Sequence, residues 1–468
     1  MRRGAASLLA LLALQACAGP YRPAPGDSQI APPPHWRDGQ GPVRPISDGW
    51  WRAFGDPALD RLVEQALAGN DDLKIAASRI EEARAQLRLT DARRLPTLAL
   101  GLSGASSRTV NAFGVGVDQE QGQAAVSSAY EVDLFGRLRQ SSEAAQADLL
   151  ATDQARDVLR LSLIATVVDG YIGLRALDSR LAIVNETIAT RGKERDLIHR
   201  RYMAGYASLL DERQAAAAYE AAARLQPATQ RAISARENAL SVLAGATPGQ
   251  IARDDNVAFA ADIATPASLP SQLLRQRPDI AEAESRVVAA DHRLGAARAA
   301  FMPQLQLSAS SGAAVSTLLS NPITVFSLGG SLLAPLFEGG RLHAQQDLAA
   351  SRRDQAAYAY RAAVLQAFRE VEDAMAGVAF VSAEAETAQR EVAADQAAYA
   401  AAKRRYDAGY ASYLEQLDSE RALLGARIDE DDLRFQRLSA IVALYRSLGG
   451  GWSTDAPADQ GLSSAPRR

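Results

Sequence analysis

Hydrophobic and polar residues alternate in two pairs of segments, and this alternation predicts four β-strands. In the third segment, Leu305 and Leu307 lie on one face of the chain, whereas the intervening Gln306 lies on the other. A period of two, with one apolar face and one polar face, is typical of a strand that is buried on one side only. The expected strands cover about 97–106, 123–135, 304–313 and 323–337.

Long segments without proline follow each strand pair and predict two very long helices. They cover about 138–203 and 342–407. At about 1.5 Å per residue, each would reach about 100 Å. Apolar residues recur at seven-residue spacing in the second one, which indicates coiled-coil packing. These residues are Val371, Val378, Ala385 and Val392.

Shorter helices are expected before the strands and after the long helices. Pro227 lies within one of them, where it marks either a simple kink or a hinge. The chain is therefore expected to be mostly α-helical with a small β part. The shorter helices cover about 71–94, 208–245, 278–301 and 412–448.

The chain carries the same order of segments twice, which indicates a tandem duplication. Residues 200–208 read Arg-Arg-Tyr-Met-Ala-Gly-Tyr-Ala-Ser, and residues 404–412 repeat this with one change, Asp in place of Met. Agreement over such a stretch is far beyond chance. The expected repeats cover 50–245 and 278–450, and residues 246–277 form an equatorial connection between them.

The N-terminus has the pattern of an export signal. Two arginines precede the apolar run Ala5–Ala16, which is too short to span a bilayer, so residues 1–16 are expected to be a signal peptide. Cys17 follows directly, either as the mature N-terminus or as an incidental residue. The proline-rich segment 17–49 predicts an extended linker, and 451–468 a flexible tail.

Composition and charge exclude several classes of function. A net charge of -4 gives no electrostatic footprint for nucleic acid. The single cysteine excludes an internal disulfide and any multi-cysteine metal site. The 4 histidines show no metal-ligand spacing, and the sequence contains no phosphate-binding loop or nucleophile motif. We therefore expect a protein that is not an enzyme and that has no metal or cofactor.

The strands are the only segments suited to crossing a membrane. No apolar run after the signal approaches the roughly 18 residues that a membrane helix needs. Four strands would leave two edges exposed, which bilayers do not tolerate, and the smallest closed membrane barrels have about eight strands. Two chains would supply eight strands and three would supply twelve, and both remain open at this point.

Six motifs, spread over nearly the whole chain, resemble those of one known family. They are Leu14-Gln15-Ala16-Cys17, Trp50-Trp51 with Phe54-Gly55-Asp56-Pro57, Tyr130-Glu131-Val132-Asp133-Leu134-Phe135-Gly136-Arg137, Arg277-Pro278-Asp279-Ile280, Pro335-Leu336-Phe337-Glu338-Gly339-Gly340-Arg341-Leu342 and Leu444-Tyr445-Arg446-Ser447-Leu448-Gly449-Gly450-Gly451-Trp452. Together they resemble the TolC-like outer-membrane factors, in the NodT/OprM lipoprotein branch that works with RND-type multidrug pumps.

This resemblance implies a fold, a location and partners. It implies a homotrimer with a twelve-stranded transmembrane β-barrel in the outer membrane and a long α-helical barrel in the periplasm. The first motif resembles a bacterial lipobox, which implies that Cys17 is acylated. The protein would be a passive duct for drugs or other small toxic compounds. Its partners would be a periplasmic adaptor (membrane fusion) protein and a proton-driven inner-membrane RND-type transporter.

The resemblance also assigns roles to the segments that follow the long helices. The two turns match the tips that contact the adaptor, although glycine alone would merely permit a turn. Leu414, Asp418 and Arg421 match the residues that constrict the periplasmic entrance, and Glu415 matches a further acidic residue there. The turns are Gly205-Tyr206-Ala207-Ser208 and Gly409-Tyr410-Ala411-Ser412.

Spacing alone is compatible with either a gate or a solvated helix face. Leu414, Asp418 and Arg421 are four and three residues apart, so they share one face of a helix. The alternative to a gate is a solvent-exposed Asp418–Arg421 ion pair within one helix. The first repeat has Leu210, Gln214 and Ala217 at the matching positions, so only the second repeat carries the charged residues.

Two other functions remain open on the sequence. A duct for type I protein secretion would share the same architecture, although the first motif and Arg277-Pro278-Asp279-Ile280 favour efflux. A periplasmic coiled-coil adaptor lipoprotein would share a lipid anchor and helical hairpins. Such an adaptor would carry a lipoyl-like β-domain and one hairpin, without this duplication.

Overall fold

The structure is a computed structural model that describes residues 25–28, 30–37, 46–110, 112–253, 270–317 and 321–452. The signal peptide, Cys17, most of the linker, the middle of the connection and most of the tail lie outside these residues. The chain forms two compact units. The first contains residues 77–154 and 282–363, and the second contains residues 31–76, 155–281 and 364 onward.

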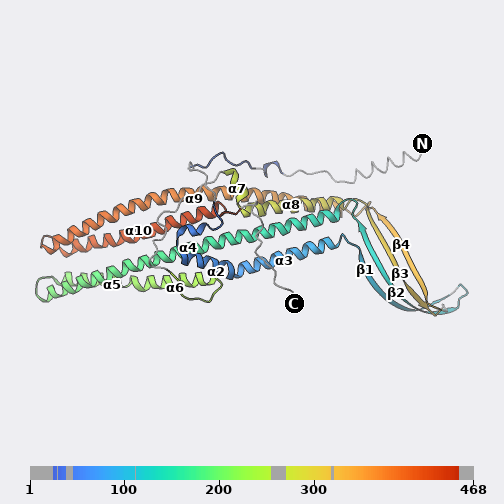
Figure 1. The fold of residues 1–468 in the computed structure, drawn as a ribbon, viewed down its shortest axis with the longest axis horizontal. Helices are drawn as coiled ribbons and strands as arrows, with labels where there is room; N and C mark the ends of the chain where they lie inside the picture. Colours follow the sequence, from blue (N-terminus) through green and yellow to red (C-terminus); the bar gives the residue numbers. More distant parts are fainter. Residues whose placement is uncertain are drawn as a thin grey trace. The chain divides into compact units, whose positions relative to one another are not determined.

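The first unit contains one antiparallel sheet with the strand order β1-β2-β3-β4 (Figure 1). The strands of the two repeats meet where β2 pairs with β3, with Val126 opposite Ser311. The outer strands β1 and β4 each pair with one neighbour within the described chain. The bounds are Thr97–Val110 for β1, Gly116–Val132 for β2, Gln304–Ser316 for β3 and Ile323–Leu333 for β4.

The register gathers large apolar side chains on one face of this sheet. Leu100 on β1 lies opposite Val126 on β2, and Phe326 on β4 lies opposite Ser311 on β3. Opposite residues point to the same face, so Leu100, Val126 and Phe326 share one side. Leu100 is 70% exposed and Phe326 is 82% exposed. The sheet therefore presents an apolar surface that the described residues leave uncovered.

Two helices of 67 residues each dominate the fold: α4 (Arg137–Met203) and α9 (Arg341–Asp407). Each begins where its strand pair ends and extends into the second unit. In the described part of the chain, no helix is both long and apolar enough to span a membrane. The remaining helices are η1 (Gly26–Ser28), η2 (Trp50–Phe54), α2 (Pro57–Gly69), α3 (Asp71–Ala92), α5 (Leu209–Ala223), α6 (Leu225–Leu243), α7 (Pro270–Gln276), α8 (Pro278–Ala299) and α10 (Tyr413–Ser447).

The first return helix, expected over about 208–245 with an interruption at Pro227, consists of two helices in the structure. Helix α5 ends at Ala223 and α6 begins at Leu225. Pro227 has no backbone N–H, so it cannot donate to the carbonyl of Ala223 four residues earlier. The second return helix, α10, contains no proline and continues for 35 residues.

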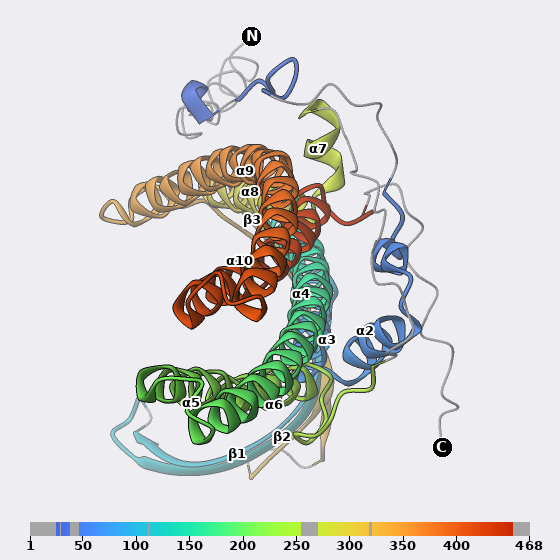
Figure 2. The ribbon, with the colours of Figure 1, turned by 90° about the vertical axis from the view of Figure 1, so that its left-hand side faces the viewer.

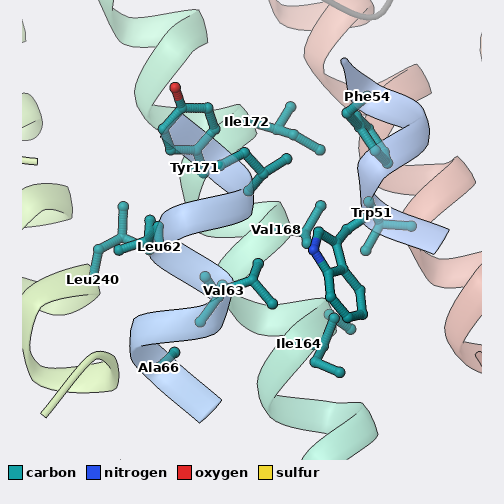
Figure 3. Packing of buried hydrophobic residues seen from close by; sticks show 14 of the residues in the cluster. Trp51, Phe54, Leu62, Val63, Ala66, Ile164, Val168, Tyr171, Ile172 and Leu240 are labelled. Atoms are coloured by element: carbon teal, nitrogen blue, oxygen red, sulfur yellow. The ribbon is translucent and has the colours of Figure 1, made fainter. Parts of the chain in front are cut away.

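A hydrophobic core in the second unit surrounds helix α2, which packs against α4 and α6 (Figure 3). Asp56 caps α2 by accepting a hydrogen bond from the N–H of Ala58 at 2.8 Å. The buried hydroxyl of Tyr171 on α4 donates to the second oxygen of Asp56 at 2.6 Å. Trp50 stacks on Tyr445 of α10 with the ring centroids 4.9 Å apart. The tryptophan motif therefore anchors the N-terminal segment to both repeats.

The Arg277-Pro278-Asp279-Ile280 motif also has a structural role within the second unit. The guanidinium of Arg277 donates to Asp279 at 2.7 Å and to Glu370 of α9 at 2.8 Å. It also donates to the carbonyl of Ser447, the last residue of α10, at 2.8 Å. Arg277 is 7% exposed, so this buried cation connects α8, α9 and the end of α10.

Candidate functional site

The two tip turns have the same backbone geometry. Gly205 and Gly409 adopt left-handed conformations, with φ of 74° and 78°. In each turn, the N–H of the following tyrosine donates back to the carbonyl of an arginine in the long helix, at 2.7 Å in the first turn and 2.8 Å in the second. This is the Schellman ending of a helix, in which glycine avoids the steric cost of positive φ.

The helices that follow the turns begin with serine caps. Ser208 and Asp211 form a reciprocal capping box at the start of α5. Ser412 caps α10 by accepting from the N–H of Glu415 at 3.3 Å. The carboxylate of Glu415 instead lies 3.5 Å from Nε of Arg405 on α9. The predicted gate residue Glu415 is thus placed across the second turn, in an exposed ion pair.

The tyrosines of both turns are free for contact with another molecule. Tyr206 is 86% exposed and Tyr410 is 80% exposed. The alanines that follow them, Ala207 and Ala411, are half-buried. Each tip therefore presents an exposed aromatic side chain on a hydrogen-bonded turn. Figure 2 shows α4 beside α5 and α9 beside α10, as two helical hairpins.

The predicted gate residues lie on the exposed face of helix α10, away from the core of the second unit. Leu414 is 52% exposed, and Asp418 and Arg421 are exposed as well. Gln416 and Glu420, on the opposite face of α10, are 2% and 6% exposed. Asp418 and Arg421 make no ion pair in the part of the chain that the structure describes, so the alternative of a pair within one helix is not formed. All three candidates lie on a face that the described part of this chain leaves exposed.

A cluster of polar side chains, buried except for one half-buried tyrosine, lies where α4, α9 and α10 meet and was not predicted from the sequence. Arg191 and Glu194 come from α4, Tyr399 from α9, and Gln416 and Glu420 from α10. Nε of Arg191 donates to Oε1 of Glu420 at 3.0 Å. Oε1 of Glu194 accepts from the Tyr399 hydroxyl at 3.1 Å and from Nε2 of Gln416 at 2.8 Å. These five residues, the buried polar cluster, join helices from both repeats.

Burial controls the protonation of this cluster. Glu194 is 8% exposed and Glu420 is 6% exposed. Removal from water, and next the negative charge of Glu420, raise the pKa of Glu194 from 4.5 to about 7. Burial also raises the pKa of the Tyr399 and Tyr413 hydroxyls, with Glu194 as the next contributor. The cluster thus contains a carboxyl group that titrates near neutral pH.

The sequence contained a weak signal for the cluster. Arg191 and Glu194 are three residues apart, and Gln416 and Glu420 are four apart, so each pair shares a helix face. Solvated faces show the same spacing, and only the packing of three helices distinguishes the two cases. In the described residues, no group of three or more histidine, cysteine, aspartate or glutamate side chains could hold a metal ion.

Comparison with known proteins identifies the same two halves. The family model described as outer membrane efflux protein matches residues 62–246 and 269–450, one match for each repeat. The pyoverdine export outer membrane protein OpmQ of Pseudomonas putida is 33% identical, over 95% of this chain and 97% of its own. The cation efflux system protein CusC of Escherichia coli is 33% identical, over 86% of this chain and 88% of its own.

Solved structures of similar proteins share the fold over nearly the whole chain. The outer-membrane channel OprN superimposes with a TM-score of 0.85 at 29% identity, covering 93% of this chain and 99% of its own. The open state of the MtrE outer membrane channel of Neisseria gonorrhoeae gives a TM-score of 0.81 at 29% identity, covering 94% and 99%. The expected fold class, mostly helical with a four-stranded sheet of the TolC type, is confirmed.

Proposed function

The chain belongs to the outer membrane efflux protein family and is a non-enzymatic outer-membrane efflux channel, and from this premise we propose that three copies close one passive duct. The open sheet carries this proposal, because β1 and β4 are edges that a bilayer does not tolerate. Three copies of four strands give twelve. Two copies would give eight, and an eight-stranded barrel is filled by its own side chains, which leaves little room for cargo.

The duct would work with two partners, since this chain has no means of supplying energy. Its sequence contains no nucleotide-binding motif. A periplasmic adaptor protein would bind the tips of the helical hairpins, and a proton-driven inner-membrane transporter of the RND type would deliver the cargo. Acylation of Cys17, which lies outside the described residues, would add a lipid anchor in the outer membrane.

The cargo is proposed to be small toxic compounds. The similar proteins are named for export of pyoverdine, of solvents, of toluene and of cations. A passive duct selects weakly, so related ducts serve chemically different pumps. These names support small-molecule efflux over type I protein secretion.

Resistance of cells that lack their own channel tests this function. Coexpression of this chain with candidate adaptor and pump pairs is expected to restore resistance to a panel of drugs and solvents. The purified protein is expected to migrate as a trimer on a gel until it is heated. A dimeric species, or no restoration with any efflux pair but restored secretion of a protein substrate, would contradict the proposal.

The tip tyrosines are expected to contribute to adaptor binding. Replacing both Tyr206 and Tyr410 by alanine should weaken binding of the adaptor that restores resistance by about tenfold or more, because exposed aromatic residues are frequent energetic hot spots of interfaces. Surface plasmon resonance with the purified trimer measures this change. Phe380→Ala is the control, since Phe380 is 66% exposed on α9 but far along the helix from the turn. Equal binding by both variants would contradict a contact at the tips.

A further inference from the structure

The buried polar cluster contains more negative than positive charge. Arg191 is its one cation, and Glu194 and Glu420 are its two acids. Nε of Arg191 bonds to Glu420, and Nη1 donates to the backbone carbonyl of Ala218 on α5 at 3.0 Å. With both acids ionised, the cluster would therefore hold an uncompensated negative charge, which is costly to bury.

One oxygen of each acid lacks a hydrogen-bond partner. Among the described residues, Oε2 of Glu194 and Oε2 of Glu420 are both buried and have no hydrogen-bond partner, while the other oxygen of each accepts one or two hydrogen bonds. The two carboxyl groups are close enough to form a hydrogen bond when one of them is protonated. A single proton would therefore convert two unsatisfied acceptors into one donor and one acceptor.

We propose that Glu194 and Glu420 share one proton, which holds the α4–α5 hairpin against the α9–α10 hairpin near their tips. The proton comes from water and returns to water, so no other reactant is needed. When it leaves, two carboxylates face each other in a buried site, and the contact between the hairpins weakens. The cluster is thus a proton-sensitive clamp between the two repeats, and it does not depend on the proposed partners or gate.

The other charged and titratable groups around Glu194 do not remove this excess. Lys403 on α9 lowers the pKa of Glu194, but this effect is smaller than the increase caused by burial and by the charge of Glu420. Tyr399 on α9 and Tyr413 on α10 remain neutral in this range, because burial raises the pKa of both hydroxyls. Arg191 on α4 is already bonded to Glu420.

The sign of the pH effect follows from the direction of the shift. The pKa of Glu194 is raised in the folded chain, from 4.5 to about 7, so the folded chain binds more protons than the unfolded chain between these values. Stability therefore falls as pH rises through this window. The clamp is strongest below about pH 4.5 and is lost above about pH 7.

Hydrogen exchange of the full-length protein in detergent tests the clamp. Protection of amides on α4 near Glu194 and on α10 near Glu420, corrected for the intrinsic exchange rate, is expected to fall about tenfold between pH 6 and pH 8. In Glu194→Gln, the new amide can donate to Glu420 at any pH. This variant should keep, at pH 8, the protection that the wild type shows at pH 6.

Glu186→Gln is the matched control, because Glu186 also reaches from α4 to α10, pairing with Arg427 at 3.3 Å, but is exposed. It should retain the pH step of the wild type. A flat profile in the wild type, or the same pH step in Glu194→Gln, would overturn the proposal. If Glu194→Gln does not fold, infrared difference spectra of the wild type decide: absence of a protonated carboxyl band that disappears between pH 6 and pH 8 would also overturn it.

Discussion

Conductance of the purified channel in a planar bilayer is expected to rise at least about tenfold when Asp418 and Arg421 are both replaced by alanine. The two side chains are exposed on α10, and neither has an ion-pair partner within the described chain. Partners for them would have to come from other copies around the entrance. Charge-assisted hydrogen bonds contribute about 1.5–3 kcal/mol each, and about 1.4 kcal/mol changes a population tenfold.

The duplication supplies a matched control for this experiment. Gln214 on α5 occupies the position in the first repeat that Asp418 occupies in the second. Gln214→Ala should leave the conductance within a factor of about two, because Gln214 is neutral and its removal breaks no charged contact. An unchanged conductance in the Asp418→Ala, Arg421→Ala double variant would show that these residues do not hold the entrance closed.

Leu414 is expected to act differently from the charged pair. It is half-exposed on the same face of α10, so three copies would place a ring of leucines around the entrance. The ring would obstruct passage by size, whereas Asp418 and Arg421 would hold the helices in place. This gate would be three-fold in charge, since the first repeat lacks both charged residues, although the two tip turns have nearly the same shape.

Most of the fold could be predicted because its signals are local and periodic. Helix α4 begins at Arg137 and ends at Met203, where the pattern predicts about 138–203. The glycine at each turn and the serine after it are enough to end one helix and start the next. Strand β1 extends to Val110, beyond the expected end near 106, because its pairing with β2 continues past the apolar stretch.

The parts that could not be predicted depend on packing between distant segments. Pro227 is visible in the sequence, but only the structure shows that the interruption falls at Arg224, between Ala223 and Leu225. Glu194 and Glu420 are 226 positions apart in the numbering, and nothing local shows that their side chains meet. The outward position of Asp418 follows from the same packing, because Gln416 and Glu420 occupy the inner face of α10.

Arg277→Ala is expected to destabilise the second unit by about 3–5 kcal/mol, because it removes the cation between two carboxylates. Asp279 and Glu370 would lose their shared donor, and the carbonyl of Ser447 at the end of α10 would lose its partner. The temperature at which the helical circular dichroism signal is lost should fall by on the order of 10 °C.

Two further variants distinguish loss of the buried hydrogen-bond network from loss of a positive charge alone. Arg275 is exposed on the neighbouring helix α7, so Arg275→Ala should change stability by less than about 0.5 kcal/mol. Arg277→Lys keeps the charge but not the planar guanidinium that donates to three acceptors. Its melting temperature should lie between those of Arg277→Ala and Arg275→Ala. Equal melting temperatures for Arg277→Ala and Arg275→Ala would contradict a structural role. If instead the motif contributed directly to export, Arg277→Ala would abolish resistance at a growth temperature where the trimer remains folded.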